Sequence, residues 1–324
     1  MNAIHWSRGQ LLAALLFVSL ASIWGGSLVA IEMGLGSVPP LWFAGLRYLL
    51  AGVVISVVAA ATGRFRPQDR SEWLSIGLTG GFVVAGYHGL LYLGTAVISG
   101  SISSVIVSLS PVLTTVAAGA VLADESPGAT DALGLLFGLG GVVVIANPGG
   151  SEIPLSGVAL VFVGVTMFAS GSVGLRALDP DLPAASLQGW SMLLGSTMLA
   201  GGAILRGEQF PVGVASGESA LPFVYLVFGA AVVGYLIYFD LLSRIGPVRV
   251  NYVAYLEPVT AAMVAWGVLG RAPTATTATG FLLVAGGFAL ATVDDPLKRL
   301  GLRSEGIVHS DLSENGSVEV HYAD

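Results

Sequence analysis

Most of this 324-residue chain consists of long stretches without aspartate, glutamate, lysine or arginine. A transmembrane helix needs about 20 mostly apolar residues, because a rise of about 1.5 Å per residue must cross about 30 Å of hydrocarbon. Residues 73–123 alone lack any such charge, which is enough for two helices with a break near 94–100. Charged residues make up 10% of the chain, against about 25% in a typical soluble domain. We therefore expect lipid to be the main solvent, which excludes a cytosolic enzyme, a nucleic-acid-binding protein and a disordered chain.

The uncharged stretches predict an all-α polytopic membrane protein with ten transmembrane helices. Barrel strands would alternate apolar and polar residues over about ten positions, whereas these stretches are apolar on all sides. The first stretch continues past a candidate signal cleavage site at Ala21 for too long to be a signal core, so we expect a retained helix. The predicted helices lie at about 11–31, 41–62, 73–94, 99–122, 132–147, 154–175, 184–205, 220–243, 250–270 and 276–293.

Lysine and arginine are unevenly distributed between the two sets of predicted loops. With the N-terminus inside, the inner loops and tails carry ten basic residues, whereas the outer loops carry only Arg206 and Arg271. Cytoplasmic loops of membrane proteins carry the excess of basic residues. We therefore expect a multi-pass protein of the plasma membrane with both termini in the cytoplasm. Residues 294–324 are rich in acidic residues and are expected to form a disordered cytoplasmic tail.

The sequence repeats weakly at an offset of 146–147 residues. Residues 107–113 align with 254–260, and three glycines in each half also align, namely Gly134, Gly140 and Gly141 with Gly280, Gly286 and Gly287. Each half, 1–147 and 153–293, holds five predicted helices, and an odd number inserts the second half upside down. Such a 5+5 inverted repeat is typical of secondary transporters, whose halves enclose a midplane site that opens alternately to each side.

Two prolines occupy the same position of this repeat, Pro111 and Pro258, each in the middle of a predicted span. Proline leaves the carbonyl four residues earlier unpaired, here that of Val107 and that of Ala254. Unpaired backbone at membrane depth is tolerated only against protein or water. Simple helix kinks would explain either proline alone, but the matched pair, beside Ser110 and Glu257, favours a shared cavity.

Short sequence motifs in both halves resemble a known family. They are Ile23–Ser27, Pro39–Pro40, Ala44–Tyr48, Leu109–Pro111 followed by Asp124–Glu125, Gly134 with Gly140–Gly141, and Tyr255–Pro258. In order and spacing they are similar to the EamA-type branch of the drug/metabolite transporter superfamily, over about Leu11 to Val293. The resemblance implies ten helices and export or exchange of small metabolites, often amino acids or related polar compounds. One departure is Gly270–Arg271, where the family usually ends its ninth helix with Gly-Glu.

Glu257 is the sharpest functional candidate, because it lies near mid-span beside a proline. Ionisable groups at membrane depth are expensive and mark functional sites. Burial penalises the charged form, so Glu257 could exchange a coupling proton near neutral pH or bind a cationic group of a substrate. An equally weighted alternative is a protonated glutamic acid that hydrogen-bonds a backbone carbonyl freed by the proline.

Three further charged residues are expected to have structural rather than functional roles. Arg47, at the position of the family's recurrent arginine in the second helix, is expected to snorkel or to pair with carbonyls rather than to contact substrate. Glu32 is expected to be an interfacial charge or a partner of Arg47. Asp240 lies four residues before Arg244, a spacing at which opposite charges pair on a helix.

The remaining candidates are polar, aromatic and proline residues that could line the cavity. His88 could instead be hydrogen-bonded packing, and serines among small residues also serve close helix packing. The full predicted cavity set is Trp24, Ser27, His88, Tyr92, Ser108, Pro111, Tyr235, Tyr238, Asn251, Tyr255, Glu257 and Pro258.

The residue inventory argues against other chemistries. The chain has no cysteine and only four histidines, three of them in the tails, so no metal site or cofactor is expected. No nucleotide-binding loop is present. We expect a non-enzymatic transporter in the lipid bilayer that acts on a small solute, coupled to a proton or sodium ion, as a monomer or a homodimer. An intramembrane enzyme and a sensory or structural membrane protein are the alternatives.

Overall fold

The structure, a computed structural model, describes residues 8–121, 129–146, 153–214, 216–245, 250 and 253–291. These residues form helices joined by short turns, and no β-strand occurs among them. The all-α architecture expected from the sequence is therefore confirmed. The predicted tail at 294–324 and the candidate Asn251 lie outside the described residues.

The first half of the chain begins with two long helices, α1 (Arg8–Leu35) and α2 (Pro40–Thr62). A continuous helical segment follows, with a π-helical middle: α3 (Arg70–Leu78), η1 (Thr79–Tyr87) and α4 (His88–Thr95). The remaining helices of this half are α5 (Gly100–Val107), α6 (Ser110–Val121) and α7 (Ala129–Ala146). The break expected near 94–100 is thus present between α4 and α5.

The second half begins with α8 (Leu155–Leu178) and α9 (Ala184–Leu205). Its next segment again has a π-helical middle: η2 (Gly217–Ser219), α10 (Ala220–Val224), η3 (Tyr225–Val233) and α11 (Gly234–Ile245). The last two helices are α13 (Val253–Leu269) and α14 (Ala275–Ala291).

Local chemistry explains where several helices begin. Pro40 starts α2, where its missing N–H costs nothing because first-turn N–H groups lack helical acceptors. The Asp69 carboxylate caps α3 by accepting the Glu72 N–H at 2.8 Å. The Ser99 hydroxyl caps α5 by accepting the Ile102 N–H at 3.3 Å. These caps fix the turns from which the helices start.

Six helical segments are long and apolar enough to cross a membrane. They are Leu11–Leu35, Pro40–Thr62, Arg70–Thr95, Gly100–Val121, Leu155–Leu178 and Gly217–Tyr238, and the shorter apolar helices are Leu256–Leu269 and Ala275–Gly287. The exposed side chains include many large apolar residues along these helices, such as Val57, Leu136 and Met263. A lipid-facing exterior explains this pattern, because water would disfavour it.

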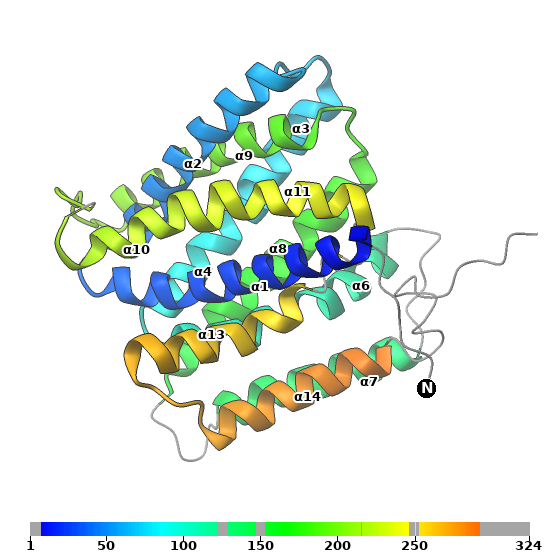
Figure 1. Ribbon diagram of the computed structural model, residues 1–324, viewed down its shortest axis with the longest axis vertical. Helices are drawn as coiled ribbons and strands as arrows, with labels where there is room; N and C mark the ends of the chain where they lie inside the picture. Colours follow the sequence, from blue (N-terminus) through cyan, green and yellow to red (C-terminus); the bar gives the residue numbers. More distant parts are fainter. Residues whose placement is uncertain are drawn as a thin grey trace, which may run out of the picture.

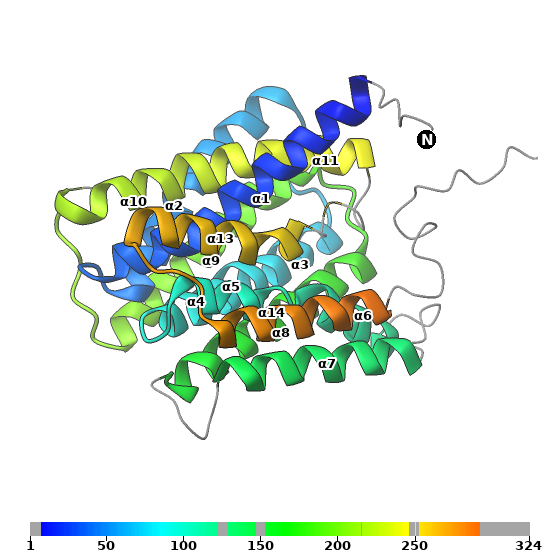
Figure 2. The same ribbon diagram turned by 60° about the horizontal axis from the view of Figure 1, so that its bottom comes forward.

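The helices pack in pairs that combine the two halves of the chain. Helix α2 packs along α9, and α7 packs along α14. Helix α14 lies in front of α7 in Figure 1, and the two are seen side by side in Figure 2. Helix α1 lies between α11 and α13 (Figure 1) and contacts both. Helix α8 contacts α6 on one side and η1 with α4 on another.

Several of these contacts have a counterpart when elements are exchanged between the two halves. The contact of α1 with α13 corresponds to that of α8 with α6, and the contact of α1 with η3 to that of α8 with η1. Likewise, η1 contacts α9 while η3 contacts α2. These contacts of one half thus recur between the corresponding elements of the other half.

Two details repeat at the same offset as the sequence motifs. The π-helices η1 and η3 are both nine residues long and start 146 residues apart, at Thr79 and Tyr225. In the α7–α14 contact, Gly141 faces the Gly280 carbonyl and Gly287 faces the Gly134 carbonyl, so closely that a β-carbon would collide. The aligned glycines thus allow these two helices to approach closely.

The two repeat prolines have different surroundings. Before Pro111 the helix is interrupted, since α5 ends at Val107 and the Leu109 N–H turns back to the Ile106 carbonyl at 3.1 Å. Helix α13 continues through Pro258. The matched positions therefore correspond to a helix break in one half and an uninterrupted helix in the other.

Candidate functional site

Arg47 lies in α2 with only 5% of its surface exposed. Its Nη1 donates a hydrogen bond to the Tyr92 hydroxyl at 2.9 Å, and the guanidinium lies 4.9 Å from the centre of the Tyr48 ring. Its Nε is buried without a hydrogen-bond partner, and no acidic residue in the described part of the chain pairs with it. A permanent positive charge is thus surrounded by neutral aromatic groups.

His88 lies next to this charge, at the start of α4. Its Nδ1 donates to the Val83 carbonyl at 2.8 Å, and its ring packs between those of Tyr48 and Tyr87, at 4.6 and 4.4 Å between ring centres. The arrangement fits the packing interpretation of His88. Tyr92 is fully buried, and its hydroxyl accepts the hydrogen bond from Arg47.

Trp24 in α1 joins an aromatic cluster contributed by α11. Its ring centre lies 5.7 Å from that of Tyr235 and 5.6 Å from that of Tyr238, and its Nε1 donates to the Ala230 carbonyl at 3.1 Å. The Tyr225 hydroxyl donates to the neighbouring Ile23 carbonyl at 2.8 Å. The structure thus brings Trp24, Tyr235 and Tyr238 together in one aromatic cluster, and neither of the pockets described below is lined by them.

Glu257 lies in α13 and is 7% exposed. Within the described residues its carboxylate has no hydrogen-bond or ion-pair partner, so the predicted alternative of a bond to a freed backbone carbonyl is not seen there. Its turn is held against α1, because the Thr260 hydroxyl donates to the Ala21 carbonyl at 2.8 Å and Gly25 lies against the Glu257 carbonyl. The backbone of Glu257 is therefore fixed, while its side chain has no partner among the described residues.

The remaining candidates have modest roles or no described side chain. The hydroxyls of Ser27 and Ser108 each donate to a carbonyl of their own helix at 2.6 Å, that of Trp24 and that of Val105. Ser108 is fully buried. Tyr255 belongs to α13, but its side chain lies outside the described part of the structure.

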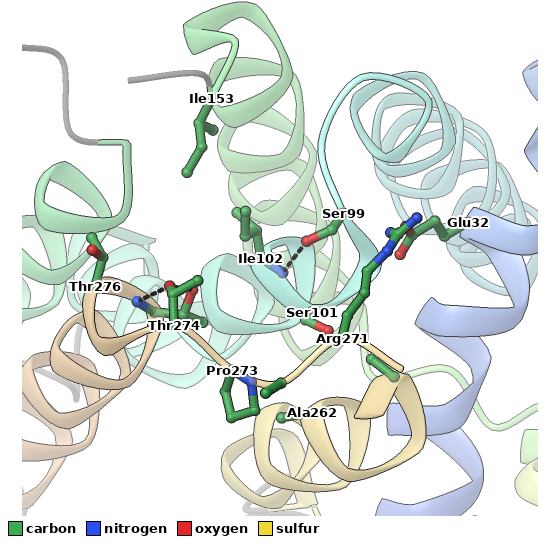
Figure 3. A pocket seen from close by; sticks show the side chains of 13 residues that line it. Glu32, Ser99, Ser101, Ile102, Ile153, Ala262, Arg271, Pro273, Thr274 and Thr276 are labelled. Carbon is green, nitrogen blue, oxygen red and sulfur yellow. Dashed lines mark hydrogen bonds and ion pairs between the residues drawn. The ribbon is translucent and has the colours of Figure 1, made fainter. Parts of the chain in front are cut away.

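A pocket of about 390 Å³ opens at the end of the bundle that holds the α1–α2 turn. Figure 3 shows Arg271, in the link after α13, reaching across to Glu32 at the end of α1. The other Glu32 oxygen accepts the Gly100 N–H at 2.8 Å. Hydroxyl groups of Ser99, Ser101, Thr274, Thr276 and Thr277 also line the pocket. Glu32 thus ties three separate elements together.

This contact decides between the two expectations for Glu32. The carboxylate pairs with Arg271 and not with Arg47, whose hydrogen bond goes to Tyr92. The pairing with Arg47 was therefore wrong, because Glu32 lies at the helix end, beside the link after α13, whereas Arg47 is buried within the bundle. Arg271 supplies the opposite charge that pairs with Glu32.

The other end of the bundle carries further paired charges. Arg64, in the α2–α3 loop, contacts the buried Glu72 at 2.6 Å, and this hydrogen bond raises the pKa of Arg64. The predicted pair of Asp240 and Arg244 is present, with 2.8 Å between Oδ2 and Nε. These contacts hold loops and a helix end in place.

Sequence reasoning missed Glu208, which lies in the loop after α9. Its Oε2 accepts the N–H groups of Leu41 and Trp42 at 3.0 and 3.2 Å, so it caps the first turn of α2. The Trp42 indole donates to the Glu208 carbonyl at 3.0 Å. A second pocket, of about 570 Å³, lies beside this loop. No local sequence signal links residues that lie 166 and 167 positions apart.

The described side chains suit solute binding better than metal binding. Within the described ranges, no three histidine or acidic side chains converge as a metal ion would require. Among the described residues, the buried charged side chains are Arg47, Glu257 and Glu72, of which Glu72 pairs with Arg64. Such groups can bind a small organic molecule that carries charge.

Comparison with known proteins gives a consistent result. Residues 11–147 and 155–293 match the model of the EamA-like transporter family. The chain is 26% identical to the uncharacterized inner membrane transporter YedA of Escherichia coli, over 78% of this chain and 81% of YedA. It is 28% identical to a probable amino-acid metabolite efflux pump of Salmonella typhimurium, over 82% of this chain and 89% of that protein.

Other comparisons concern length and fold. The chain spans 63% and 62% of two further relatives, from Arabidopsis thaliana and Archaeoglobus fulgidus. A protein of known crystal structure, 22% identical, shares the fold with a TM-score of 0.62 over 91% of this chain and 99% of its own.

Proposed function

Because the chain belongs to the EamA-like transporter family, we propose that it is a secondary transporter for a small polar organic metabolite. It exports or exchanges an amino acid or a related compound. The family and its relatives indicate a transporter rather than an enzyme.

The transport mechanism we propose is alternating access between two inverted halves, 1–147 and 153–293, of five spans each. The observation that carries this proposal is a set of matched contacts between the halves: α1 contacts α13 as α8 contacts α6, and η1 contacts α9 as η3 contacts α2. The matched π-helices and the reciprocal glycine contacts of α7 and α14 support the same relation. Halves of this kind rock against each other around a fixed midplane site.

The orientation of the transporter follows from its basic residues. The end of the bundle with the start of α1 carries most of the arginines, so we assign it to the cytoplasm, with both termini. The Glu32–Arg271 pocket then faces the outside. Breaking the Glu32–Arg271 pair is the step that opens the outer side, because the Glu32 carboxylate joins α1 to α5 and to the link after α13.

Glu257 is assigned to the solute or to its coupling proton. A carboxyl group that is buried and lacks a partner in the described chain is costly, and a cation or a proton relieves that cost. The amino-acid class is supported by the Salmonella relative, whose name describes amino-acid metabolite efflux.

Flux in proteoliposomes tests the proposal. The purified full chain should move radiolabelled amino acids across the vesicle membrane, with saturation and with acceleration by unlabelled solute on the far side. An intramembrane enzyme or a sensory protein predicts no such flux. Equal uptake by protein-free vesicles for every solute tested would overturn the transporter assignment.

A further inference from the structure

Matched tryptophan contacts occur at the two ends of the α2–α9 pair. At one end, Trp42 in α2 donates its indole N–H to the Glu208 carbonyl at 3.0 Å, in the loop after α9. At the other end, Trp190 in α9 donates to the Phe65 carbonyl, also at 3.0 Å, in the loop after α2. Each tryptophan therefore holds the loop that follows the other helix. We call these two hydrogen bonds the indole contacts.

Each indole contact is reinforced by a phenylalanine of the loop that it holds. The ring centres of Trp42 and Phe210 lie 5.0 Å apart, and those of Trp190 and Phe65 lie 5.2 Å apart. Aromatic pairs at such separations stabilise a structure beyond the area that they bury. The two ends of the pair are thus held by the same type of contact, although the two loops differ in sequence.

Between its ends, the α2–α9 pair is packed closely at two glycines. A β-carbon at Gly52 would lie 2.9 Å from that of Met192, and one at Gly189 would lie 2.6 Å from the Ser56 hydroxyl. Small residues at such positions allow the backbones of membrane helices to approach each other closely. Helices α2 and α9 are therefore joined along their length as well as at both ends.

The contact between Glu32 and Arg271 is of a weaker kind. It is an ion pair in which the Arg271 side chain is 62% exposed, and exposed ion pairs contribute little to stability. Parting α1 from the link after α13 breaks this ion pair, whereas parting α2 from α9 breaks both indole contacts and uncovers the faces that carry the glycines. Of these two interfaces, α2–α9 therefore resists opening more strongly.

The place of the α2–α9 pair in the fold indicates what this resistance does. Helices α2 and α9 are counterparts of each other, so exchanging the halves maps the pair onto itself. Figure 1 shows this pair at one edge of the molecule and α7 with α14, also counterparts in contact, at the opposite edge. An axis that relates the halves passes through such pairs, and rocking of the halves about that axis displaces them least.

We propose that the indole contacts keep α2 and α9 together throughout the transport cycle, so that the two halves rock about this pair as a pivot. This inference rests on the proposed alternating access and locates its fixed point. It makes Trp42 and Trp190 positioning residues, which act through the backbone that they hold rather than by contact with the solute.

A disulfide between α2 and α9 tests the proposal. The chain has no cysteine, and a β-carbon at Gly45 would lie 3.5 Å from that of Leu199, a separation that a disulfide can span. The oxidised Gly45→Cys/Leu199→Cys protein should carry the same solute flux in proteoliposomes as after reduction. Loss of flux on oxidation that reduction restores would show that α2 and α9 must separate, and it would overturn the proposal.

The Glu32–Arg271 pair provides the contrasting link. Glu32→Cys/Arg271→Cys, joined by a bifunctional methanethiosulfonate, should lose flux and regain it on reduction, because this pair has to part when the outer side opens. Each linked protein is compared with itself after reduction, so arrest is not confused with misfolding. Continued flux with this second link would refute the opening step at Glu32, whereas the α2–α9 link decides the pivot.

Removal of either indole N–H is an independent test. Trp42→Phe and Trp190→Phe keep an aromatic ring but lose the hydrogen bond, so the pivot loosens. Each should lower the maximum flux by about two- to tenfold, as loss of one hydrogen bond implies, while the half-saturating solute concentration stays the same. Trp266→Phe alters a residue of α13 that is 64% exposed; it is the matched control and should change neither value.

The two tests combined distinguish a pivot from a merely structural role. The oxidised Gly45→Cys/Leu199→Cys link should restore the maximum flux of Trp42→Phe, because the covalent bond replaces the lost contact. If the cysteine variant does not fold, the tryptophan variants decide: unchanged or faster flux in both Trp42→Phe and Trp190→Phe would overturn the proposal. Absence of flux for every solute in the unaltered chain would instead refute transport itself.

Discussion

The charges at the ends of the bundle and the charges in its interior differ in one respect. At the ends, each charge pair described here is formed within the chain: Glu32 with Arg271, Arg64 with Glu72, and Asp240 with Arg244. In the interior, Arg47 and Glu257 are more deeply buried than most of these residues, yet in the part of the chain that the structure describes neither pairs with an opposite charge.

This difference separates structural from functional charge in a protein with few ionisable residues. Ion pairs near water contribute little to the free energy of folding, but they hold loops and helix ends in position. An interior charge without a partner has a large solvation cost that packing cannot repay. Its retention in the sequence is explained when a solute or a proton completes it during the transport cycle.

The largest effect is expected for Glu257→Gln. The amide keeps the shape of the side chain but cannot bind a proton or attract an ammonium group. Amino-acid flux in proteoliposomes should fall at least roughly tenfold, as loss of a charge-assisted hydrogen bond implies, and the remaining flux should no longer depend on pH. Flux is measured with radiolabelled solute at several pH values.

A glutamate outside the interior gives the control for that prediction. Glu218→Gln alters an exposed side chain in η2 and should change neither the flux nor its pH profile. An unaltered pH profile in Glu257→Gln would refute the coupling role of Glu257.

A smaller effect is expected at the Glu32–Arg271 pair. Arg271→Gln should loosen the contacts among α1, α5 and the link after α13. The chain has no cysteine, so Ser101→Cys introduces a single thiol in the lining of this pocket. Its labelling by a membrane-impermeant maleimide should become roughly two- to fivefold faster when Arg271→Gln is added, since exposed ion pairs contribute about 0.2–1 kcal/mol.

The double variant tests whether the pair itself is responsible. If Glu32 and Arg271 act on each other, Glu32→Gln with Arg271→Gln should label no faster than the faster single variant. Additive acceleration would show that the two residues act independently.

Glu72→Gln should affect stability rather than transport. The Glu72 carboxylate accepts the Gln68 N–H at 2.7 Å and pairs with Arg64. Its neutralisation should lower the melting temperature by a few degrees in a thermal-shift assay, while flux per folded molecule stays the same. A clear loss of flux at unchanged stability would place Glu72 in the transport machinery instead.

Asp240→Asn is expected to have the smallest effect. Asp240 and Arg244 are both well exposed at the end of α11, and exposed pairs at this spacing contribute only a few tenths of a kcal/mol. Melting temperature and flux should both stay within error of the wild type. A marked fall in flux would contradict the assignment of paired charges at the ends of the bundle to structure rather than transport.

The sequence predicts helix positions well because charged residues delimit the apolar stretches. Helix α9 spans Ala184–Leu205, which matches the predicted span 184–205 and ends directly before the charged Arg206. The offset of 146 residues also reappears in the positions of η1 and η3, although nothing in composition predicts π-helical geometry.

Side-chain partnerships were harder to predict, because they depend on which helix faces meet. The Asp240–Arg244 pair was predicted since both residues lie on one helix, four positions apart. Glu32 and Arg271 are 239 residues apart, so their contact follows only from the packing of α1 and α13. That Arg47 lacks an acidic partner could likewise not be read from the residue types alone.

One set of thermal-shift measurements with a single binding amino acid tests the central claim most directly. Ligands that bind the folded protein raise its melting temperature. The account predicts that this rise becomes much smaller in Glu257→Gln but persists in Glu32→Gln and Asp240→Asn. A rise that is unchanged in Glu257→Gln, or disappears in both end variants, would contradict it.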